Sequence, residues 1–101
     1  MKNLNFDKNP FEKDGQSPEV DFPVNYNLKV IFDNQAETEV QQRNLELVLE
    51  DAEVNHNFVK SRQSRKGNFV SLTMNVTLQN MKQMQYLYQR LKLLPGIRFA
   101  V

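Results

Sequence analysis

Basic side chains concentrate in one short stretch of the sequence, and we expect binding chemistry there. Four cations lie within residues 60–66, and a Gly-Asn pair follows them. A turn rich in serine, glycine and arginine can present backbone N–H groups and guanidinium groups to a phosphate or a carboxylate. We therefore predict an anion-binding or partner-binding site made of Lys60, Arg62, Arg65, Lys66, Gly67, Asn68, Phe69 and Ser71. A solvated loop that only keeps a sheet edge soluble remains the alternative.

Residues that could support catalysis are few. His56 is the only histidine, and general acid–base chemistry also needs a positioned partner. The carboxylates of residues 37–53 fall on an expected helix, which is typical of a solvated face. With three glycines and no cysteine, a glycine-rich phosphate loop, a thiolate nucleophile and a thiolate metal site are excluded. The sequence predicts no catalytic, cofactor or metal site, and therefore a protein that is not an enzyme.

Length and composition indicate one globular domain. The chain has 101 residues, of which 40% are hydrophobic and 25% are charged. A net charge of +1 gives no overall attraction to nucleic acid or membrane, so such binding would need a local patch. No apolar run approaches the roughly 20 residues of a membrane span, and residues 1–15 do not resemble a signal peptide. We predict a cytoplasmic protein with no membrane partner.

The first 22 residues differ from the rest of the chain. They are mostly polar, they include two prolines, and their few apolar residues show no period. Such a segment cannot bury enough surface to offset the entropy of ordering it. We predict a flexible N-terminal tail over residues 1–22 and a folded domain over residues 23–101.

Alternating apolar residues indicate the strands of this domain. In residues 24–32 every second residue is apolar, a period of two, and residues 69–76 repeat the pattern. Residues 54–62 alternate poorly and carry cations, which suits an edge strand. Residues 97–101 predict a short last strand.

Apolar residues at intervals of three and four indicate two helices. We expect the first over residues 35–51, capped by Asn34 with Glu37 three residues later. We expect the second over residues 78–93, capped by Thr77. The apolar side of the first would comprise Ala36, Val40, Leu45, Val48, Leu49 and Ala52.

This order of elements predicts an α+β fold, a ferredoxin-like βαββαβ sandwich. Its four strands would form an antiparallel sheet with both helices on one face. The first and third strands, which alternate best, would lie in the centre. The other face would stay open, so function is expected on that face or on the basic hairpin.

Nucleic-acid binding through the hairpin of residues 60–66 is the alternative function. Residues 66–70 resemble the start of the third strand in the RNA-recognition motif. Base stacking needs aromatic platforms, and the open face offers only Phe69, with Asn25, Asn27 and Lys29 from the first strand. The sequence therefore disfavours nucleic acid as the partner.

The open face could instead contact a second copy of the chain. Its small polar residues, together with two apolar ones, suit a solvated surface, a homodimer packed sheet to sheet, or a dimer paired along a strand edge. The sequence does not separate these readings for Asn25, Asn27, Ser71, Thr73, Asn75, Ile31 and Phe69.

The hairpin and the second helix are similar to the YbeD-like family (domain of unknown function 493). The matching residues are Ser-Arg-Lys-Gly-Asn-Phe at 64–69, Ser-Leu-Thr-Met at 71–74, and Leu87-Tyr88. The resemblance covers residues 21–101. It implies a ferredoxin-like fold similar to ACT regulatory domains, which bind small effectors such as amino acids, usually at subunit interfaces.

The resemblance also frames the expected function. ACT effector sites commonly use a glycine in the turn between first strand and first helix, and residues 32–36 contain none. We expect a small regulatory or binding module that acts through contacts with a protein partner, with a small anionic effector and no cofactor.

Overall fold

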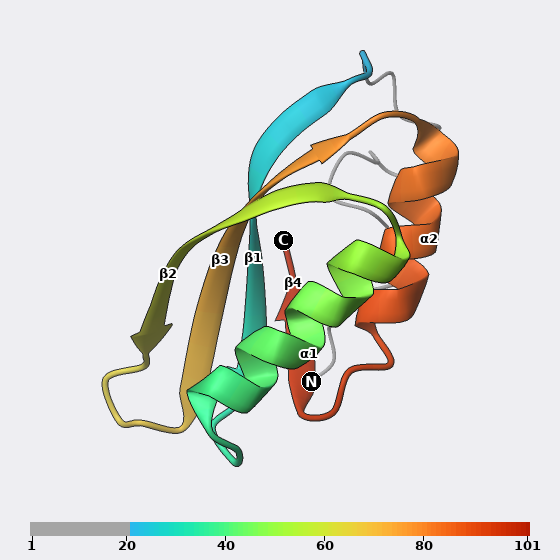
Figure 1. Ribbon diagram of the computed structural model, residues 1–101. Helices are drawn as coiled ribbons and strands as arrows, with labels where there is room; N and C mark the ends of the chain where they lie inside the picture. Colours follow the sequence, from blue (N-terminus) through green and yellow to red (C-terminus); the bar gives the residue numbers. More distant parts are fainter. Residues whose placement is uncertain (1–20) are drawn as a thin grey trace, which may run out of the picture.

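The computed structural model describes residues 21–101, which form one antiparallel sheet with two helices (Figure 1). The elements are β1 (Val24–Asp33), α1 (Thr38–Asp51), β2 (Asn55–Gln63), β3 (Phe69–Leu78), α2 (Met81–Leu91) and β4 (Ile97–Ala100). The strand order is β2-β3-β1-β4, so β1 and β3 are central and β2 is an edge strand. The predicted ferredoxin-like βαββαβ fold is confirmed.

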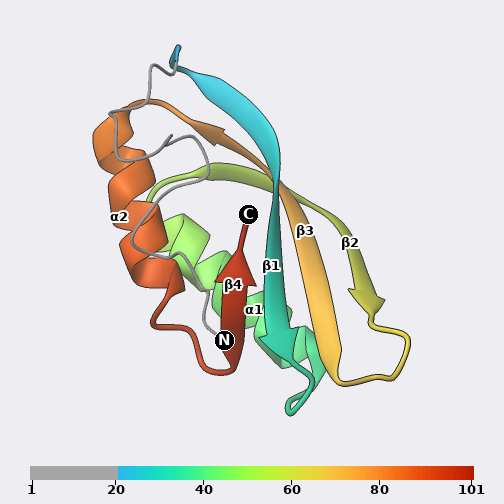
Figure 2. The ribbon, with the colours of Figure 1, turned by 180° about the vertical axis from the view of Figure 1, so that it is seen from behind.

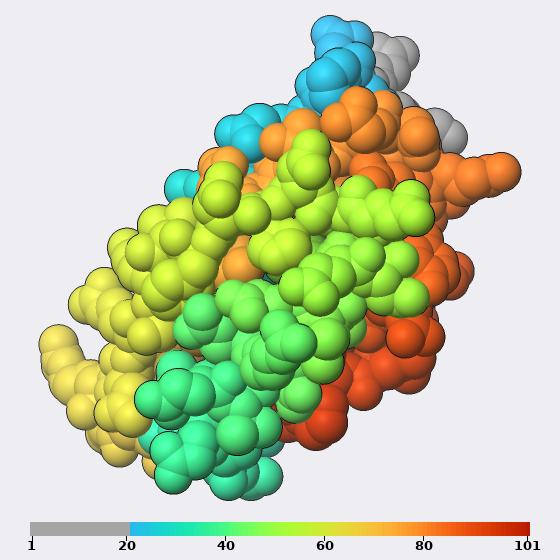
Figure 3. All heavy atoms as spheres, viewed as in Figure 1, coloured from blue at the N-terminus to red at the C-terminus, as the bar shows by residue number. Residues whose placement is uncertain are grey.

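Both helices cover the same face of the sheet, and the view from behind shows the strands uncovered by either helix (Figure 2). In the space-filling view, α1 lies at the centre with α2 to its right and β2 to its left, and the β2–β3 hairpin projects beyond α1 at the lower left (Figure 3). The core lies between the two layers. It is built from alternate residues of the central strands, for example Leu28 and Val30 of β1 and Leu72 and Met74 of β3, all 0% exposed. Burial of such apolar side chains stabilises the domain, and it fixes which face is left open.

The predicted start of the first helix is wrong. The helix α1 begins at Thr38, and its N-cap is Glu37, which makes no side-chain cap hydrogen bond. Asn34 does not cap it: its Nδ2 donates to the Gly67 carbonyl at 2.8 Å, and its N–H donates to the Asn68 carbonyl at 3.0 Å. A capping pattern does not predict the helix start when the side chain of the capping residue hydrogen-bonds to another part of the fold, here the hairpin. The turn after β1 is therefore tied to the β2–β3 hairpin.

The predicted apolar side of α1 is also partly wrong. Val40 is 50% exposed, and the buried position on this turn belongs to Gln41. Gln41 Nε2 donates to the Asp33 carbonyl at 2.8 Å. This hydrogen bond to the end of β1 allows a polar side chain to occupy a buried position of the helix.

The second helix begins later than predicted. Thr77 stays in β3, which runs to Leu78, and the N-cap of α2 is Asn80, whose Oδ1 accepts from the Gln83 N–H at 2.8 Å. Thr77 Oγ1 instead accepts from Asn25 Nδ2 of the neighbouring strand at 2.9 Å. Cross-strand pairing therefore extends β3 past the residue that looked like a cap.

Most of the predicted tail, residues 1–22, lies outside the described residues. Within the described part, Phe22 precedes β1 and packs against the core, partly buried. Neither described helix is long and apolar enough to cross a membrane.

A pair of tyrosines joins the sheet to α2. The hydroxyls of Tyr26 and Tyr88 lie 2.7 Å apart. Burial raises the pKa of Tyr88 well above the ordinary value for tyrosine, and the neighbouring Tyr26 raises it further. Burial also raises the pKa of Tyr26, against a smaller lowering by its bond to Tyr88. The folded state therefore retains these protons at a pH at which the unfolded chain has lost them.

We expect this pair to cause a loss of stability at alkaline pH. The stability it contributes is complete below the tyrosine pKa of the unfolded chain, about 10, and is lost as the pH rises above that value. In Tyr88→Phe, the melting temperature should fall less steeply between about pH 9.5 and 11 than in the parent protein. Tyr86→Phe removes a more exposed phenol, whose pKa is also raised by the hydrogen bond that it donates to Asp51, so it should change the slope in the same direction but by less. Equal slopes in all three proteins would contradict the prediction.

Candidate anion-binding groove on the open sheet face

The open face is organised in rows of side chains across neighbouring strands. Each row contributes one residue from β1, one from β3 and one from β2. One row holds Lys29, Thr73 and Lys60, and the next row toward the hairpin holds Ile31, Ser71 and Arg62. Basic and apolar side chains therefore meet at the hairpin end of the face.

The opposite end of the face is a network of asparagines. Asn25 Nδ2 donates to Asn75 Oδ1 at 2.8 Å, and Asn75 Nδ2 donates to Asn27 Oδ1 at 2.9 Å. These amides already use one another as partners.

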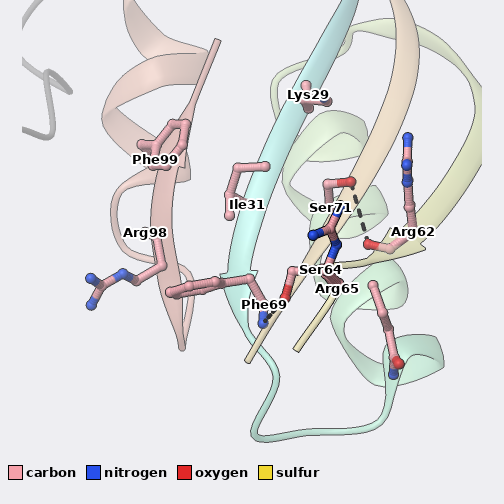
Figure 4. A pocket seen from close by; sticks show the side chains of 10 residues that line it. Lys29, Ile31, Arg62, Ser64, Arg65, Phe69, Ser71, Arg98 and Phe99 are labelled. Carbon is pink, nitrogen blue, oxygen red and sulfur yellow. Dashed lines mark hydrogen bonds between the residues drawn. The ribbon is translucent and has the colours of Figure 1, made fainter. Parts of the chain in front are cut away.

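A groove of about 820 Å³ occupies the hairpin end of the open face (Figure 4). In the close view, the hairpin residues lie on one side, β4 contributes the other side, and Ile31 of β1 lies between them (Figure 4). The groove is lined by Lys29, Ile31, Arg62, Gln63, Ser64, Arg65, Phe69, Ser71, Arg98 and Phe99.

A β-bulge places two consecutive residues of β4 in this groove. Neighbouring residues of β1 pair with Phe99 and Ile97, so Arg98 is an extra residue on β4. Bulges of this kind re-aim side chains. Ile97 and Ala100 pack against the core, while Arg98 and Phe99 both line the groove. Strict alternation would have placed only one of these two side chains on the open face.

The conformation of the hairpin turn positions the basic residues of β2 and of the turn itself. The Gly67 N–H donates to the Ser64 carbonyl at 2.9 Å, and Gly67 has φ +77°, a left-handed conformation that glycine adopts without strain. Phe69 N–H donates to Ser64 Oγ at 3.1 Å. With the two bonds from Asn34, these contacts anchor the turn from both sides.

The charges of the groove are unbalanced. It carries four cations, Lys29, Arg62, Arg65 and Arg98. Within the described part of the chain, Arg98 is the one that pairs with a carboxylate, its Nε lying 3.6 Å from Asp33 Oδ1. Arg98 also lies 5.6 Å from the centre of the Phe69 ring, a cation–π contact. Three cations thus face the groove without a carboxylate among residues 21–101.

This imbalance reflects a division of charge along the chain. No aspartate or glutamate follows Glu53, whereas eight lysines and arginines do. The acidic residues between 37 and 53 lie on and next to α1, on the helix-covered side. A charge asymmetry of this kind is visible in the sequence, and it would have pointed to Arg98 as well as to the hairpin, but not to Lys29, which precedes Glu53.

Half of the predicted site residues line the groove. Arg62, Arg65, Phe69 and Ser71 do so. Lys60 lies one row further along β2, and the turn residues Lys66, Gly67 and Asn68 are not among the lining residues. Sequence reasoning missed Lys29, Ile31, Gln63, Ser64, Arg98 and Phe99 as site residues.

The lone histidine lies away from the groove. His56 of β2 pairs with buried Val76, which places it on the core side of the sheet, and its Nδ1 lies 2.8 Å from the Val54 carbonyl. No cluster of three histidine, cysteine or acidic side chains that could hold a metal ion occurs among residues 21–101.

Thr73, beside the groove, carries a buried hydroxyl. It is 5% exposed, flanked by two lysines, and its Oγ1 has no hydrogen-bond partner among the described residues. Thr73→Val removes this hydroxyl with little change of shape, so we expect it to raise the free energy of unfolding by about 1 kcal/mol. The matched change Thr77→Val removes a hydroxyl that accepts a hydrogen bond and should destabilise. Urea denaturation measures both, and a loss of stability in Thr73→Val would contradict the expectation.

Comparison with known proteins identifies the family. A family model described as "Protein of unknown function (DUF493)" matches residues 17–101. The chain belongs to the DUF493 family. No curated protein matches this DUF493 chain.

Solved structures with the same fold include a protein from Helicobacter pylori and an ACT domain. A solution structure of HP0495 from Helicobacter pylori is 16% identical, with a TM-score of 0.61, covering 93% of this chain and 98% of that one. A second solution structure of HP0495 is 15% identical, with a TM-score of 0.54 and coverages of 87% and 96%. The ACT domain from the GTP pyrophosphokinase of Chlorobium tepidum is 9% identical, with a TM-score of 0.55 and coverages of 78% and 96%. The DUF493 domain therefore has an ACT-like fold.

Proposed function

We propose that this DUF493 domain is a regulatory binding module, not an enzyme, that takes a small organic anion in the open-face groove and acts through protein contacts. The observation that carries the proposal is the groove itself. Four cations surround an apolar floor of Ile31, Phe69 and Phe99, and one carboxylate, Asp33, is paired with one of those cations. Pockets with apolar walls and a few convergent charged groups are typical of small-ligand sites.

The position of the groove differs from the usual effector position in ACT domains. That position uses a glycine in the turn after the first strand, and residues 32–36 contain none. Asn34 in this turn is bonded to the hairpin instead. ACT-like folds often bind small ligands in regulation, and we place the ligand of this domain on the open face.

Thermal-shift screening tests the proposal. A ligand that binds only the folded state at a concentration of 100 times its Kd stabilises the protein by about 2.7 kcal/mol. We expect small organic anions such as phosphate esters and tricarboxylates to raise the melting temperature, and neutral or cationic compounds of similar size to have no effect. If no anion in the screen raises it, the proposal is wrong.

Nucleic-acid binding is the second candidate, because the structure adds an aromatic that the sequence did not reveal. Phe99 joins Phe69 on the open face, and two exposed rings beside cations suit base stacking. Binding of a strand through phosphates would fall steeply as salt rises. We expect single-stranded oligonucleotides to bind weakly and to be released at physiological salt. Tight binding that persists there would favour the second candidate.

A homodimer through the open face would compete with the ligand. Sheet-to-sheet packing of a second copy would cover Phe69 and Phe99. Sedimentation measured with and without a bound anion distinguishes the two, because the proposed groove needs the face to be free.

A further inference from the structure

We infer that the anion taken by the groove is a mononucleotide, with its phosphate at the hairpin side and its base against the two phenylalanines. The inference rests on the proposed function and gives it a ligand class. It is carried by the placement of Arg62 and Arg65 at the hairpin side of one groove and of the Phe69 and Phe99 rings toward its β4 side, where Arg98 also lies (Figure 4).

The hairpin side suits a phosphate better than a carboxylate. Arg62 and Arg65 supply two guanidinium groups, and Lys29 adds a third cation, none of them paired with a carboxylate in the described chain. A phosphate monoester carries a charge of about −1.5 to −2 and three acceptor oxygens, which can use two guanidinium forks at once. A single carboxylate, with one charge, would leave most of these donors unused.

A serine hydroxyl completes the hairpin side. Ser64 Oγ lines the groove and accepts a hydrogen bond from the Phe69 N–H at 3.1 Å. Because the oxygen acts as the acceptor there, its own hydrogen remains available to donate to a ligand oxygen.

The β4 side suits a planar ring. Phe69 is 38% exposed and Phe99 is 39% exposed, and Ile31 lies on the strand between theirs. Arg98, paired with Asp33, lies 5.6 Å from the Phe69 ring centre, so a cation lies next to the rings. Aromatic side chains of this kind bind a nucleobase by stacking, with little dependence on which base it is.

The surroundings of the groove favour one nucleotide over a strand. A volume of about 820 Å³ falls in the range of small-ligand pockets. Beyond Lys29, the face continues into the asparagine network, whose amides bond to one another. Amides that already hydrogen-bond to one another have few donors and acceptors left for the base edges of a longer strand.

Isothermal titration with a nested set of probes tests the inference. The set is adenosine 5′-monophosphate, uridine 5′-monophosphate, ribose 5-phosphate, adenosine and citrate. We expect both mononucleotides to bind on the order of tenfold to a hundredfold more tightly than ribose 5-phosphate, since one stacked base contributes that much. Adenosine, which lacks the phosphate, should also bind more weakly than the mononucleotide.

The variant Phe99→Leu tests whether this ring binds the base, and Phe58→Leu is its matched control. Phe58 is 42% exposed on β2 and does not line the groove. In Phe99→Leu, adenosine monophosphate should lose most of its advantage in affinity over ribose 5-phosphate, while ribose 5-phosphate itself binds as before. In Phe58→Leu, both affinities should match the parent protein. The thermal unfolding of each variant shows that it is folded, and Phe69→Leu repeats the test from the other ring.

The titrations distinguish a failure of the mononucleotide inference from a failure of the proposed function. If ribose 5-phosphate or citrate binds but the mononucleotides bind no more tightly, the inference is wrong and the proposed function stands. If no anion binds, both are wrong. If a tetranucleotide binds more than tenfold more tightly than the mononucleotide, the ligand is a strand and the inference is overturned.

Discussion

Replacing Arg62 and Arg65 together by alanine is expected to weaken the binding of an organic phosphate at least about a hundredfold. Both side chains line the groove, and neither pairs with a carboxylate in the described chain. A hydrogen bond to a charged group contributes about 1.5–3 kcal/mol, so the loss of two guanidinium groups amounts to about two to four powers of ten in Kd. Isothermal titration of the parent and the double variant with ribose 5-phosphate measures the effect.

A second double variant separates contact from overall charge. Arg43→Ala/Lys82→Ala also removes two positive charges, from α1 and α2 on the opposite side of the sheet. If the anion were held only by long-range attraction, both double variants would weaken binding alike. We expect the helix variant to bind within about twofold of the parent, since exposed charges at this distance are screened. Arg62→Lys/Arg65→Lys should fall between them, because lysine keeps the charge but not the planar fork.

Leu72→Ala is expected to have the largest effect on stability, a loss of about 3–4 kcal/mol. Leu72 lies in the middle of β3, is 0% exposed, and packs in the core between the sheet and the helices. Its neighbour Ser71 points to the open face and lines the groove. Ser71→Ala should therefore change the free energy of unfolding by less than about 0.5 kcal/mol, the usual effect of a surface substitution.

Urea denaturation of these two neighbouring variants tests the assignment of the two faces. Because successive strand residues point to opposite sides, the large effect should belong to one residue and the small effect to the other. Similar losses in both variants would show that the face carrying the groove is covered in solution.

The sheet could be predicted from the sequence because its period is two and one face is buried. In residues 24–32 and 69–76, a shift by one residue would expose the whole apolar set, so the pattern determines the register. The helix starts could not be predicted in the same way. Asn34 and Thr77 have the residue types of caps, but both make hydrogen bonds to partners far along the chain. Local capping preference is too weak to prevail over such contacts.

The groove could be predicted only in part, for a related reason. Arg62, Arg65, Phe69 and Ser71 lie close together in the sequence, so the hairpin alone brought them together. Lys29 joins them because β1 lies beside β3, which requires the sheet order.

The contribution of β4 could not be predicted from the sequence pattern. Arg98 and Phe99 reach the same face only because of the bulge. A bulge interrupts the alternation on which a sequence reading depends, and a four-residue strand is too short to reveal the interruption.

Chemical-shift mapping during a titration with ribose 5-phosphate tests the central claim most directly. We expect saturable changes in the backbone amide signals of the groove, concentrated in Lys29, Ile31, Ser64, Phe69 and Phe99. The signals of α1 and α2 should move little, since these helices lie on the other face. Changes centred on residues 32–36 or on the helices, or small changes that never saturate, would contradict an anion site on the open face.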